Sequence, residues 1–187
     1  MPKFREELIE NPIIAAVRNE EDLEQAILSR VSIVFVLYGD ILNISQICAK
    51  LRRKNKLTFI HVDLVDGLKG DFAGMRYIKQ CANPNGIIST KSSNIKYGNQ
   101  LDLLTIQRVF ILDSLSLKTG IKNIHENNPD ALEVLPGVAS KIIGVIEKEI
   151  KMPIIAGGLI KEKKDIMNSL SAGAIAISTT THKLWNL

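Results

Sequence analysis

Residues 153–178 read PIIAGGLIKEKKDIMNSLSAGAIAIS, and this stretch contains one complete unit of the pattern that the chain repeats. It begins with a short apolar run, Pro153–Ala156, and ends with a second one, Ala174–Ser178. Between them, Lys163–Ala172 carries apolar side chains at helical spacing. A strand, a helix and a second strand in this order predict two parallel strands joined by a right-handed crossover.

The same alternation extends from this unit back to the start of the chain. Eight units in 187 residues have about 23 residues each, enough for a strand of ~5, a helix of ~12 and two short loops. The expected strands are Ile13–Val17, Ser32–Tyr38, Leu57–Val65, Gly86–Ser89, Thr105–Leu112, Ala131–Leu135, Pro153–Ala156 and Ala174–Ser178. The expected helices are Glu20–Ser29, Ile44–Lys54, Phe72–Cys81, Ile95–Leu103, Leu115–Asn127, Val138–Ile150 and Lys163–Ala172, with the tail Thr180–Leu187 as a short eighth helical piece.

Eight strand–helix units predict an α/β fold, a small TIM-like (β/α)8 barrel formed as a single domain by residues 1–187. A doubly wound open sheet is the alternative. That fold usually has fewer strands and often a glycine-rich first turn, whereas the first turn here reads Ala16-Val17-Arg18-Asn19-Glu20. In the barrel, the amphipathic segment Phe4–Ile9 is expected to cover the bottom.

Composition excludes several classes of protein. A charged content of 24% and a hydrophobic content of 45% exclude a disordered chain, and a net charge of +4 permits contact with nucleic acid without demonstrating it. The longest dense apolar stretch, Val31–Tyr38, is far shorter than the roughly 20 residues of a membrane span. Cys48 and Cys81 lack metal-ligand spacing, and no signal peptide opens the chain, so we expect reduced thiols in a cytoplasmic protein.

Polar side chains within or just after the expected strands mark a candidate site, because functional residues of barrels gather at the carboxyl ends of strands. Side chains alternate along a strand, so His61 and Asp63 are expected to share the inward face of the third one. The residues expected at the mouth of the barrel are Arg18, Asp63, Lys91, Arg108 and Glu133. They indicate a polar ligand; the alternative is a network of ion pairs among them that fills the lumen.

The sharpest local signal follows the seventh and eighth strands. Gly157 and Gly158 come after the seventh, and Ser178 and Thr179 end the eighth. In barrels, these two loops and a helix N-terminus form the usual phosphate site. Glycine has no Cβ, so backbone N–H groups can approach phosphate oxygens, and the two hydroxyls add donors. The four residues therefore predict a phosphate site, the alternative being that the glycine pair only makes a tight turn.

Several motifs, in order and over nearly the whole chain, resemble one known family. They are HVDLVDGL at 61–68, GIISTK at 86–91, TIQRVFILDS at 105–114, PD at 129–130, EVLPG at 133–137, PIIAGGLI at 153–160, IST at 177–179 and LW at 184–185. This set resembles the glycerol-3-phosphate-responsive antiterminator family, which regulates glycerol uptake operons in bacteria. One position departs from the family pattern: Val65 stands where an acidic residue is expected.

The resemblance implies a barrel that senses glycerol 3-phosphate as its effector and uses no cofactor. When liganded, such a protein binds the leader mRNA of its operon, prevents premature termination and stabilises the transcript. The resemblance assigns the phosphate to Gly157, Gly158, Ser178 and Thr179, and the glycerol side to Asp63, Lys91, Arg108 and Glu133. It implies no catalytic residue and no metal ligand.

Two clusters of cations are candidates for contact with RNA phosphates. Lys161, Lys163 and Lys164 follow the phosphate glycines closely, so ordering of that loop by the effector would present them to RNA. The rival cluster, 52–56, belongs to the opposite face and would require longer-range coupling. We expect the first cluster to contact RNA, and because aromatic content is only 5%, we expect shape and phosphate contacts to dominate.

The alternative function is a phosphate-binding barrel enzyme acting on a glycerol, triose or sugar phosphate. The run 61–67, H-x-D-x-x-D-G, resembles the metal-side strand of ribulose-phosphate epimerases, whose chemistry would need a second imidazole near His61. His125 and His182 fall in expected helical segments away from the strand ends, so that cluster is not expected to assemble. A glycerol-phosphate prenyltransferase is a further enzyme alternative, which would need a long apolar groove.

Overall fold

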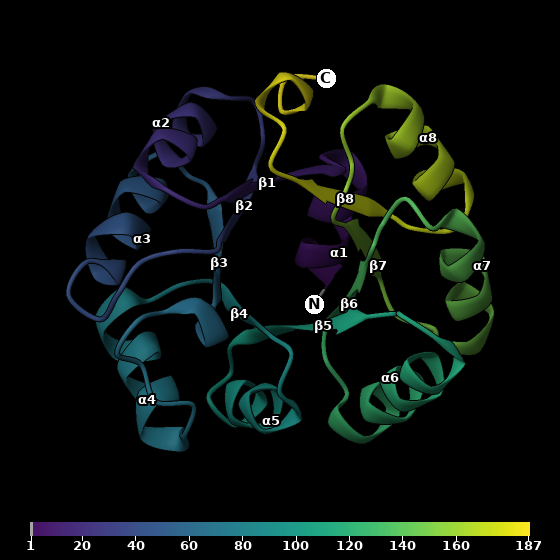
Figure 1. The fold of residues 1–187 in the computed structure, drawn as a ribbon. Helices are drawn as coiled ribbons and strands as arrows, with labels where there is room; N and C mark the ends of the chain where they lie inside the picture. Colours follow the sequence, from purple (N-terminus) through teal and green to yellow (C-terminus); the bar gives the residue numbers. More distant parts are fainter. Residues whose placement is uncertain (1) are drawn as a thin grey trace.

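The computed structural model describes residues 2–187, which form a closed barrel of eight parallel strands (Figure 1). The strands are β1 (Ile13–Val17), β2 (Ile33–Val36), β3 (Leu57–His61), β4 (Gly86–Ser89), β5 (Leu104–Phe110), β6 (Ala131–Leu135), β7 (Ile154–Gly157) and β8 (Ala176–Thr179). Each strand pairs with the next in chain order, and β8 pairs with β1 so that Ile14 lies beside Ser178. This closure confirms the (β/α)8 barrel and excludes the open sheet.

Helices follow β1 to β7 in turn and surround the barrel (Figure 1). They are α2 (Glu20–Leu28), α3 (Ile44–Arg53), α4 (Phe72–Tyr77), α5 (Ser92–Gln100), α6 (Ser114–Asn127), α7 (Ser140–Glu149) and α8 (Lys163–Ser171). After β8, the tail contains one short 3-10 turn, His182–Leu184. Across residues 2–187, every helix is too short or too polar to cross a bilayer.

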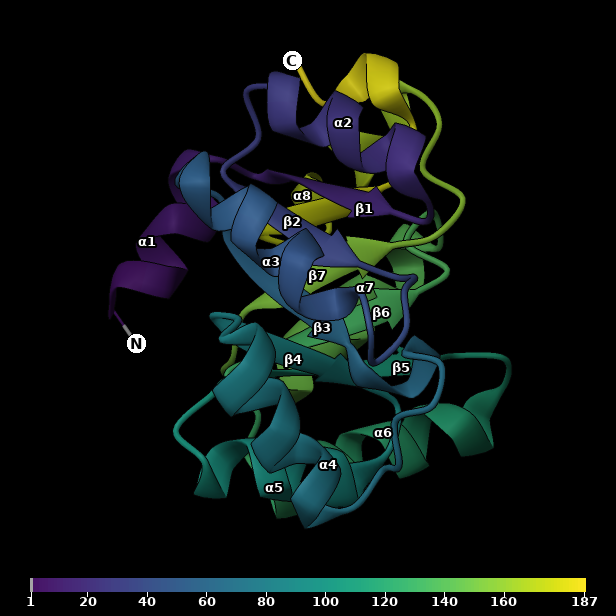
Figure 2. The same ribbon diagram turned by 90° about the vertical axis from the view of Figure 1, so that its left-hand side faces the viewer.

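The first helix, α1 (Pro2–Glu10), covers the bottom of the barrel, as expected for this segment. Figure 2 shows it at the end from which the strands start. Phe4 and Leu8 are buried against the lower lumen, and the ring of Phe4 lies 5.1 Å from that of Phe59, centroid to centroid. The helix therefore closes this end with apolar side chains.

Apolar side chains fill two regions of the barrel, the layer between the strands and the helices and the lower part of the lumen. A polar region lies above the second of these. Outward strand residues pack against the helices, and inward residues such as Ile14, Phe35 and Ile155 fill the lower lumen. Above this filling, the inward positions become polar, with Arg108 and Glu133 among the buried side chains. The bottom of the lumen is thus a packed core, and polar chemistry is confined to the mouth.

Three expected strands end earlier than their apolar patterns indicate, and the difference is largest in the third. We expected a strand to Val65, but β3 ends at His61 and the 3-10 turn Val62–Leu64 follows. The expectation that Asp63 points inward by strand alternation is therefore wrong. The turn directs Asp63 sideways to the end of β4, where its carboxylate accepts hydrogen bonds from Ser89 and Thr90.

Candidate ligand site at the mouth of the barrel

A cavity of about 280 Å³ opens at the mouth beside the ends of β7 and β8. Its walls come from the loops after these two strands and from the ends of β1, β2, β5 and β6. The lining residues are Ala16, Leu37, Arg108, Glu133, Leu135, Gly158, Leu159, Ile160, Lys161, Ser178, Thr179, Thr180 and Thr181. The cavity lies where the glycine pair and the end of the eighth strand predicted a phosphate site.

Glu133 forms the charged floor of this cavity. Its side chain is fully buried, with Oε2 accepting from Arg108 Nε at 2.5 Å and Oε1 from Ser178 Oγ at 2.5 Å. A buried carboxylate needs this compensation, because an unpaired charge away from water is costly. The contacts also fix the guanidinium of Arg108. Its two terminal nitrogens have no partner within residues 2–187, which leaves their N–H groups available to a ligand.

Glycine is required at positions 157 and 158 for two different structural reasons. A Cβ at Gly157 would lie 2.5 Å from Ser178 Oγ and 2.6 Å from Glu133 Oε1, so only glycine permits the Glu133–Ser178 contact. Gly157 does not line the cavity. Gly158 does, and its φ of +80° is followed by a φ of +61° at Leu159. Two successive left-handed residues turn the chain so that its backbone faces the cavity.

Backbone N–H groups are further donors that this site offers. Within the described chain, those of Gly158, Leu159, Ile160 and Thr180 have no hydrogen-bond acceptor, and all four residues line the cavity. The N–H groups of Lys161 and Glu162 are already bound to the carboxylate of Asp165. The free N–H donors that line the cavity therefore lie in the loops after β7 and β8.

The two hydroxyls expected to bind phosphate are engaged within the protein. Ser178 donates to Glu133, and Thr179 Oγ1 donates to the carbonyl of Ile160 at 2.8 Å. Thr181 Oγ1 reaches the same carbonyl at 3.1 Å, which ties the loop after β8 to the loop after β7. Both Ser178 and Thr179 line the cavity, so their role as ligand contacts stays a prediction.

The tail after β8 was not expected at the site, although the run Thr179–His182 is polar. Thr180 and Thr181 line the cavity. Trp185 is buried and donates from Nε1 to the carbonyl of Thr179 at 2.9 Å. His182 Nε2 lies 2.7 Å from the carboxylate of Asp22 at the start of α2. These contacts hold the tail against the barrel.

Asp63 and Lys91 lie away from the cavity. Asp63 accepts hydrogen bonds from Thr90 N–H and Ser89 Oγ, both at 2.8 Å, and from the Asn94 amide at 3.0 Å. Burial raises the pKa of Asp63, but these hydrogen bonds outweigh it and hold the pKa below its usual value. Lys91 is exposed just before α5 and forms no ion pair with Asp63. The expected network is thus limited to Arg108 and Glu133.

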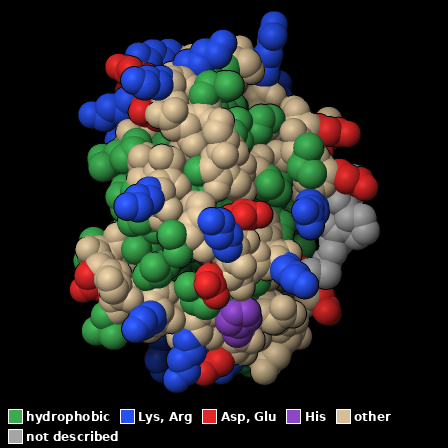
Figure 3. Space-filling view, turned by 90° about the vertical axis from the view of Figure 1, so that its right-hand side faces the viewer, with side chains coloured by type: hydrophobic (Ala, Val, Ile, Leu, Met, Phe, Trp, Pro, Cys, Tyr) green, Lys and Arg blue, Asp and Glu red, His purple; other side chains and the backbone are tan. Residues whose placement is uncertain are grey.

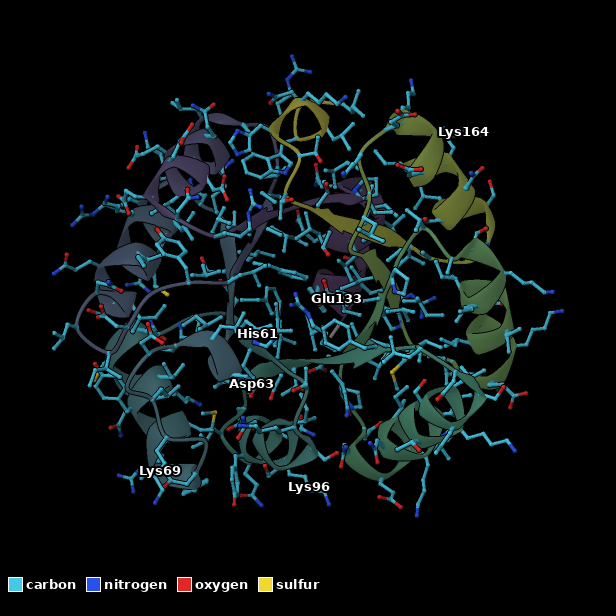
Figure 4. The ribbon with its side chains drawn as sticks, viewed as in Figure 1. His61, Asp63, Lys69, Lys96, Glu133 and Lys164 are labelled. Atoms are coloured by element: carbon cyan, nitrogen blue, oxygen red, sulfur yellow. The ribbon has the colours of Figure 1, made fainter. Side chains whose placement is uncertain are left out.

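Figure 4 shows His61 and Glu133 inside the barrel and Asp63 nearer its edge. His61 is buried, and its Nδ1 has no hydrogen-bond partner in the described chain and lies 3.9 Å from Asp63 Oδ2. Burial, together with the charge of Arg108, lowers the pKa of His61 to about 4, so its imidazole is neutral at neutral pH. His125 lies on α6 and His182 in the tail, so neither is placed beside His61 in the lumen.

The remaining predicted cations lie around the mouth. Arg18, directly after β1, is about half exposed and donates from both its backbone N–H and Nε to Asp22. Lys161 lines the cavity, while Lys163 and Lys164 are exposed at the start of α8. Figure 3 views the molecule from the side of α7 and α8 and shows Lys and Arg side chains gathered toward its upper end, and Figure 4 places Lys164 beside α8 at the outer edge of the molecule. Among residues 2–187, no three His, Cys, Asp or Glu side chains are grouped as metal ligands.

The fold and the cavity define a small (β/α)8 barrel with a polar ligand site at the carboxyl ends of its strands. Residues 13–185 match the family described as glycerol-3-phosphate responsive antiterminator, and the chain belongs to that family. The resemblance inferred from the motifs is thereby confirmed.

Three similar proteins extend this result. The chain is 39% identical over 180 residues to YgcP of Escherichia coli K12, described as uncharacterized, covering 96% of this chain and 94% of that protein. A glycerol uptake operon antiterminator regulatory protein from Listeria monocytogenes is similar in crystal structure, with 31% identity, a TM-score of 0.89 and coverage of 92% and 94% of the two chains. A glycerol uptake operon antiterminator-related protein from Thermotoga maritima has 31% identity, a TM-score of 0.83 and coverage of 94% and 98%.

Proposed function

We propose that this protein is an RNA-binding regulator controlled by glycerol 3-phosphate. The effector occupies the cavity, and the liganded barrel binds the leader mRNA of a glycerol-utilisation operon, prevents premature termination and stabilises the transcript. Membership of the family supports the effector and the regulatory role. The observation that carries the proposal is that Gly158, Leu159, Ile160 and Thr180 all line one small cavity and that their N–H groups have no acceptor within residues 2–187.

The cavity has different chemistry at its two ends. The loops after β7 and β8 offer N–H donors, which suit the phosphate, with Lys161 beside them. The floor offers the carboxylate of Glu133 and the free N–H groups of Arg108, which suit hydroxyl groups that both donate and accept. In the proposed complex the phosphate therefore lies at the loops, away from the Glu133 carboxylate, and the glycerol lies toward the lumen.

RNA phosphates are proposed to contact Lys161, Lys163 and Lys164, which form no ion pair within residues 2–187. The rival cluster at the bottom of the barrel is partly engaged in the fold. Arg52 donates to the carbonyl of Asn83 at 2.9 Å, and Lys56 donates to that of Val31 at 2.6 Å. Free cations beside the effector cavity give the simpler route by which the effector and RNA are coupled.

Leader-RNA binding with and without effector tests the proposal. The probe is the 5′ leader of a glycerol-utilisation operon from the same genome, with a scrambled RNA of equal length as control. We expect tight binding of the leader in the presence of glycerol 3-phosphate, weaker binding with glycerol or inorganic phosphate, and weaker binding at higher salt. Affinity that is independent of glycerol 3-phosphate, or equal for the scrambled RNA, would overturn the proposal.

A further inference from the structure

A second cavity, of about 460 Å³, lies beside the first at the end of β5 and the start of α6. Phe110, Leu115 and Asn123 form part of its wall, and Thr90, directly after β4, lines it as well. Arg108 lines this cavity as well as the effector cavity. The two spaces therefore share one cationic side chain between them.

An exposed aromatic ring marks this second cavity. Phe110 lies two residues after Arg108 on β5, so both side chains project from the same face of the strand. Phe110 is 51% exposed and Leu115 is 72% exposed. An exposed aromatic face next to a guanidinium is the kind of platform on which an unpaired nucleobase stacks.

Polar groups at the cavity suit a base rather than a phosphate. The amide of Asn123 makes no hydrogen bond within the described chain, so it presents both donor and acceptor to the edge of a base. Asp113 also lines the cavity, and its carboxylate accepts the N–H of Ser116. A carboxylate in the wall repels phosphate and accepts hydrogen bonds from an exocyclic amino group.

We propose that this cavity binds one unpaired nucleobase of the RNA, stacked on Phe110 and contacted by Asn123. The proposal rests on the proposed function and adds to it a base-binding site distinct from the lysine contacts. The backbone phosphates of the same RNA lie on Lys161, Lys163 and Lys164, while one base turns into the cavity.

Arg108 gives this site a physical link to the effector. Its Nε is held by Glu133, and its terminal nitrogens are without partners in the described chain. An effector that accepts hydrogen bonds from these nitrogens restricts the guanidinium and so shapes the adjoining wall of the base cavity. Coupling between two ligands is reciprocal. If glycerol 3-phosphate raises the affinity for RNA by a given factor, RNA bound in this way raises the affinity for glycerol 3-phosphate by the same factor.

Four variants of the full chain test the base site by fluorescence anisotropy with the leader RNA at saturating glycerol 3-phosphate. Phe110→Leu keeps an apolar side chain and removes the ring, and we expect the Kd to rise roughly 5- to 150-fold, the range for one stacked base. Phe110→Trp keeps a stacking face and is expected to bind like the wild type. Asn123→Ala is expected to weaken binding. Leu42→Ala is the control, because Leu42 is 81% exposed in the loop after β2.

Cross-linking supplies a second readout. A leader RNA containing 4-thiouridine is irradiated on the protein, and the linked peptide is identified by mass spectrometry. We expect a cross-link within 110–123 that requires glycerol 3-phosphate. The thermal shift by glycerol 3-phosphate, measured for each variant, verifies that the fold and effector site are intact.

The outcomes separate the two proposals. If the wild type does not bind the leader with effector present, the proposed function fails and the base site with it. If the wild type binds and Phe110→Leu binds equally well without a cross-link in this segment, the base site is overturned and the regulatory function stands. If Phe110→Leu alters the sedimentation mass but not RNA affinity, this face joins two copies of the chain, which also overturns the base site.

Discussion

Glu133 shows how one residue organises the candidate site. Its two oxygens hold Arg108 from β5 and Ser178 from β8, so three strands are fixed by a single carboxylate. The same carboxylate requires glycine at position 157, where any Cβ would collide with it. The local sequence predicted a special role for this glycine pair. The reason for Gly157, however, lies in side chains of β6 and β8, and a pattern within one loop does not contain it.

At the level of single residues, we expect Gly158→Asp to abolish binding of glycerol 3-phosphate. The new carboxylate would enter the cavity beside the free N–H groups and repel the phosphate. We expect glycerol 3-phosphate at a hundredfold excess over Kd to stabilise the wild type by about 2.7 kcal/mol, measured as a rise in Tm. Because φ is +80° here, Gly158→Asn is the control, since asparagine tolerates this backbone and carries no charge. If the thermal shift persists in Gly158→Asp, the phosphate does not bind at this loop.

His61 predicts a pH dependence of stability. Its folded-state pKa is lowered to about 4, whereas the unfolded side chain titrates near 6.5. Between these values the unfolded state binds more protons than the native state, so the free energy of unfolding falls as the pH falls from about 6.5 to about 4. We expect His61→Gln to flatten this part of the curve in urea titrations. His125→Gln, on the exposed side of α6, should leave it unchanged, and equal curves for wild type and His61→Gln would contradict the assignment.

At the level of elements, the apolar periods placed the strands and helices well, and the differences occur at the boundaries of the elements. The third strand was expected to continue through Val65, because its residues remain apolar at alternate positions. The chain instead turns after His61, since the carboxylate of Asp63 finds donors from β4 and α5. Such donors lie about thirty residues away in the chain, so the strand pattern alone does not reveal them.

The loop and first turn at α8 carry the prediction on RNA phosphates. We expect the triple change of Lys161, Lys163 and Lys164 to glutamine to weaken leader binding and to make its dependence on salt shallower. The slope of the logarithm of the binding constant against the logarithm of the salt concentration is negative. Its magnitude should decrease by roughly 0.7 to 0.9 for each RNA phosphate that a lysine no longer neutralises. Filter binding at several salt concentrations measures both effects. The matched control is Arg53→Gln with Lys54→Gln at the end of α3. If only the control variant loses affinity, the RNA lies at the bottom of the barrel.

At the level of the whole molecule, the apolar core of the lumen and the polar candidate site lie at opposite ends of the barrel axis. Apolar side chains and α1 fill the lumen at one end, and the two cavities that share Arg108 open at the other. The alternation of strands and helices sufficed to predict this barrel, and the two cavities described above open at the end where the site was expected. The full set of residues that line the cavity could not be predicted. Thr180 and Thr181 belong to the tail, which lies between α2 and α8, and the repeating pattern does not indicate that position.

This separation predicts a variant with a purely structural effect. Leu8 is fully buried beneath the lumen, so Leu8→Ala should lower the free energy of unfolding by about 2–5 kcal/mol. The substitution lies at the opposite end from both cavities, so the Kd for glycerol 3-phosphate should not change at temperatures where the variant is folded. Urea unfolding and calorimetric titration measure the two quantities. A weaker Kd in the folded variant would show that the two ends are coupled.

The apolar filling of the lower lumen has a kinetic consequence. Ile14, Phe35, Phe59 and Ile155 leave no passage through the barrel axis beneath the polar region, so the effector cavity has its opening at the mouth. A transcript seated on the lysines and over this opening would obstruct the path by which glycerol 3-phosphate leaves. The dissociation of the effector would then be slowed for as long as the transcript stays in place. The RNA-bound state would therefore outlast a brief rise in the concentration of glycerol 3-phosphate.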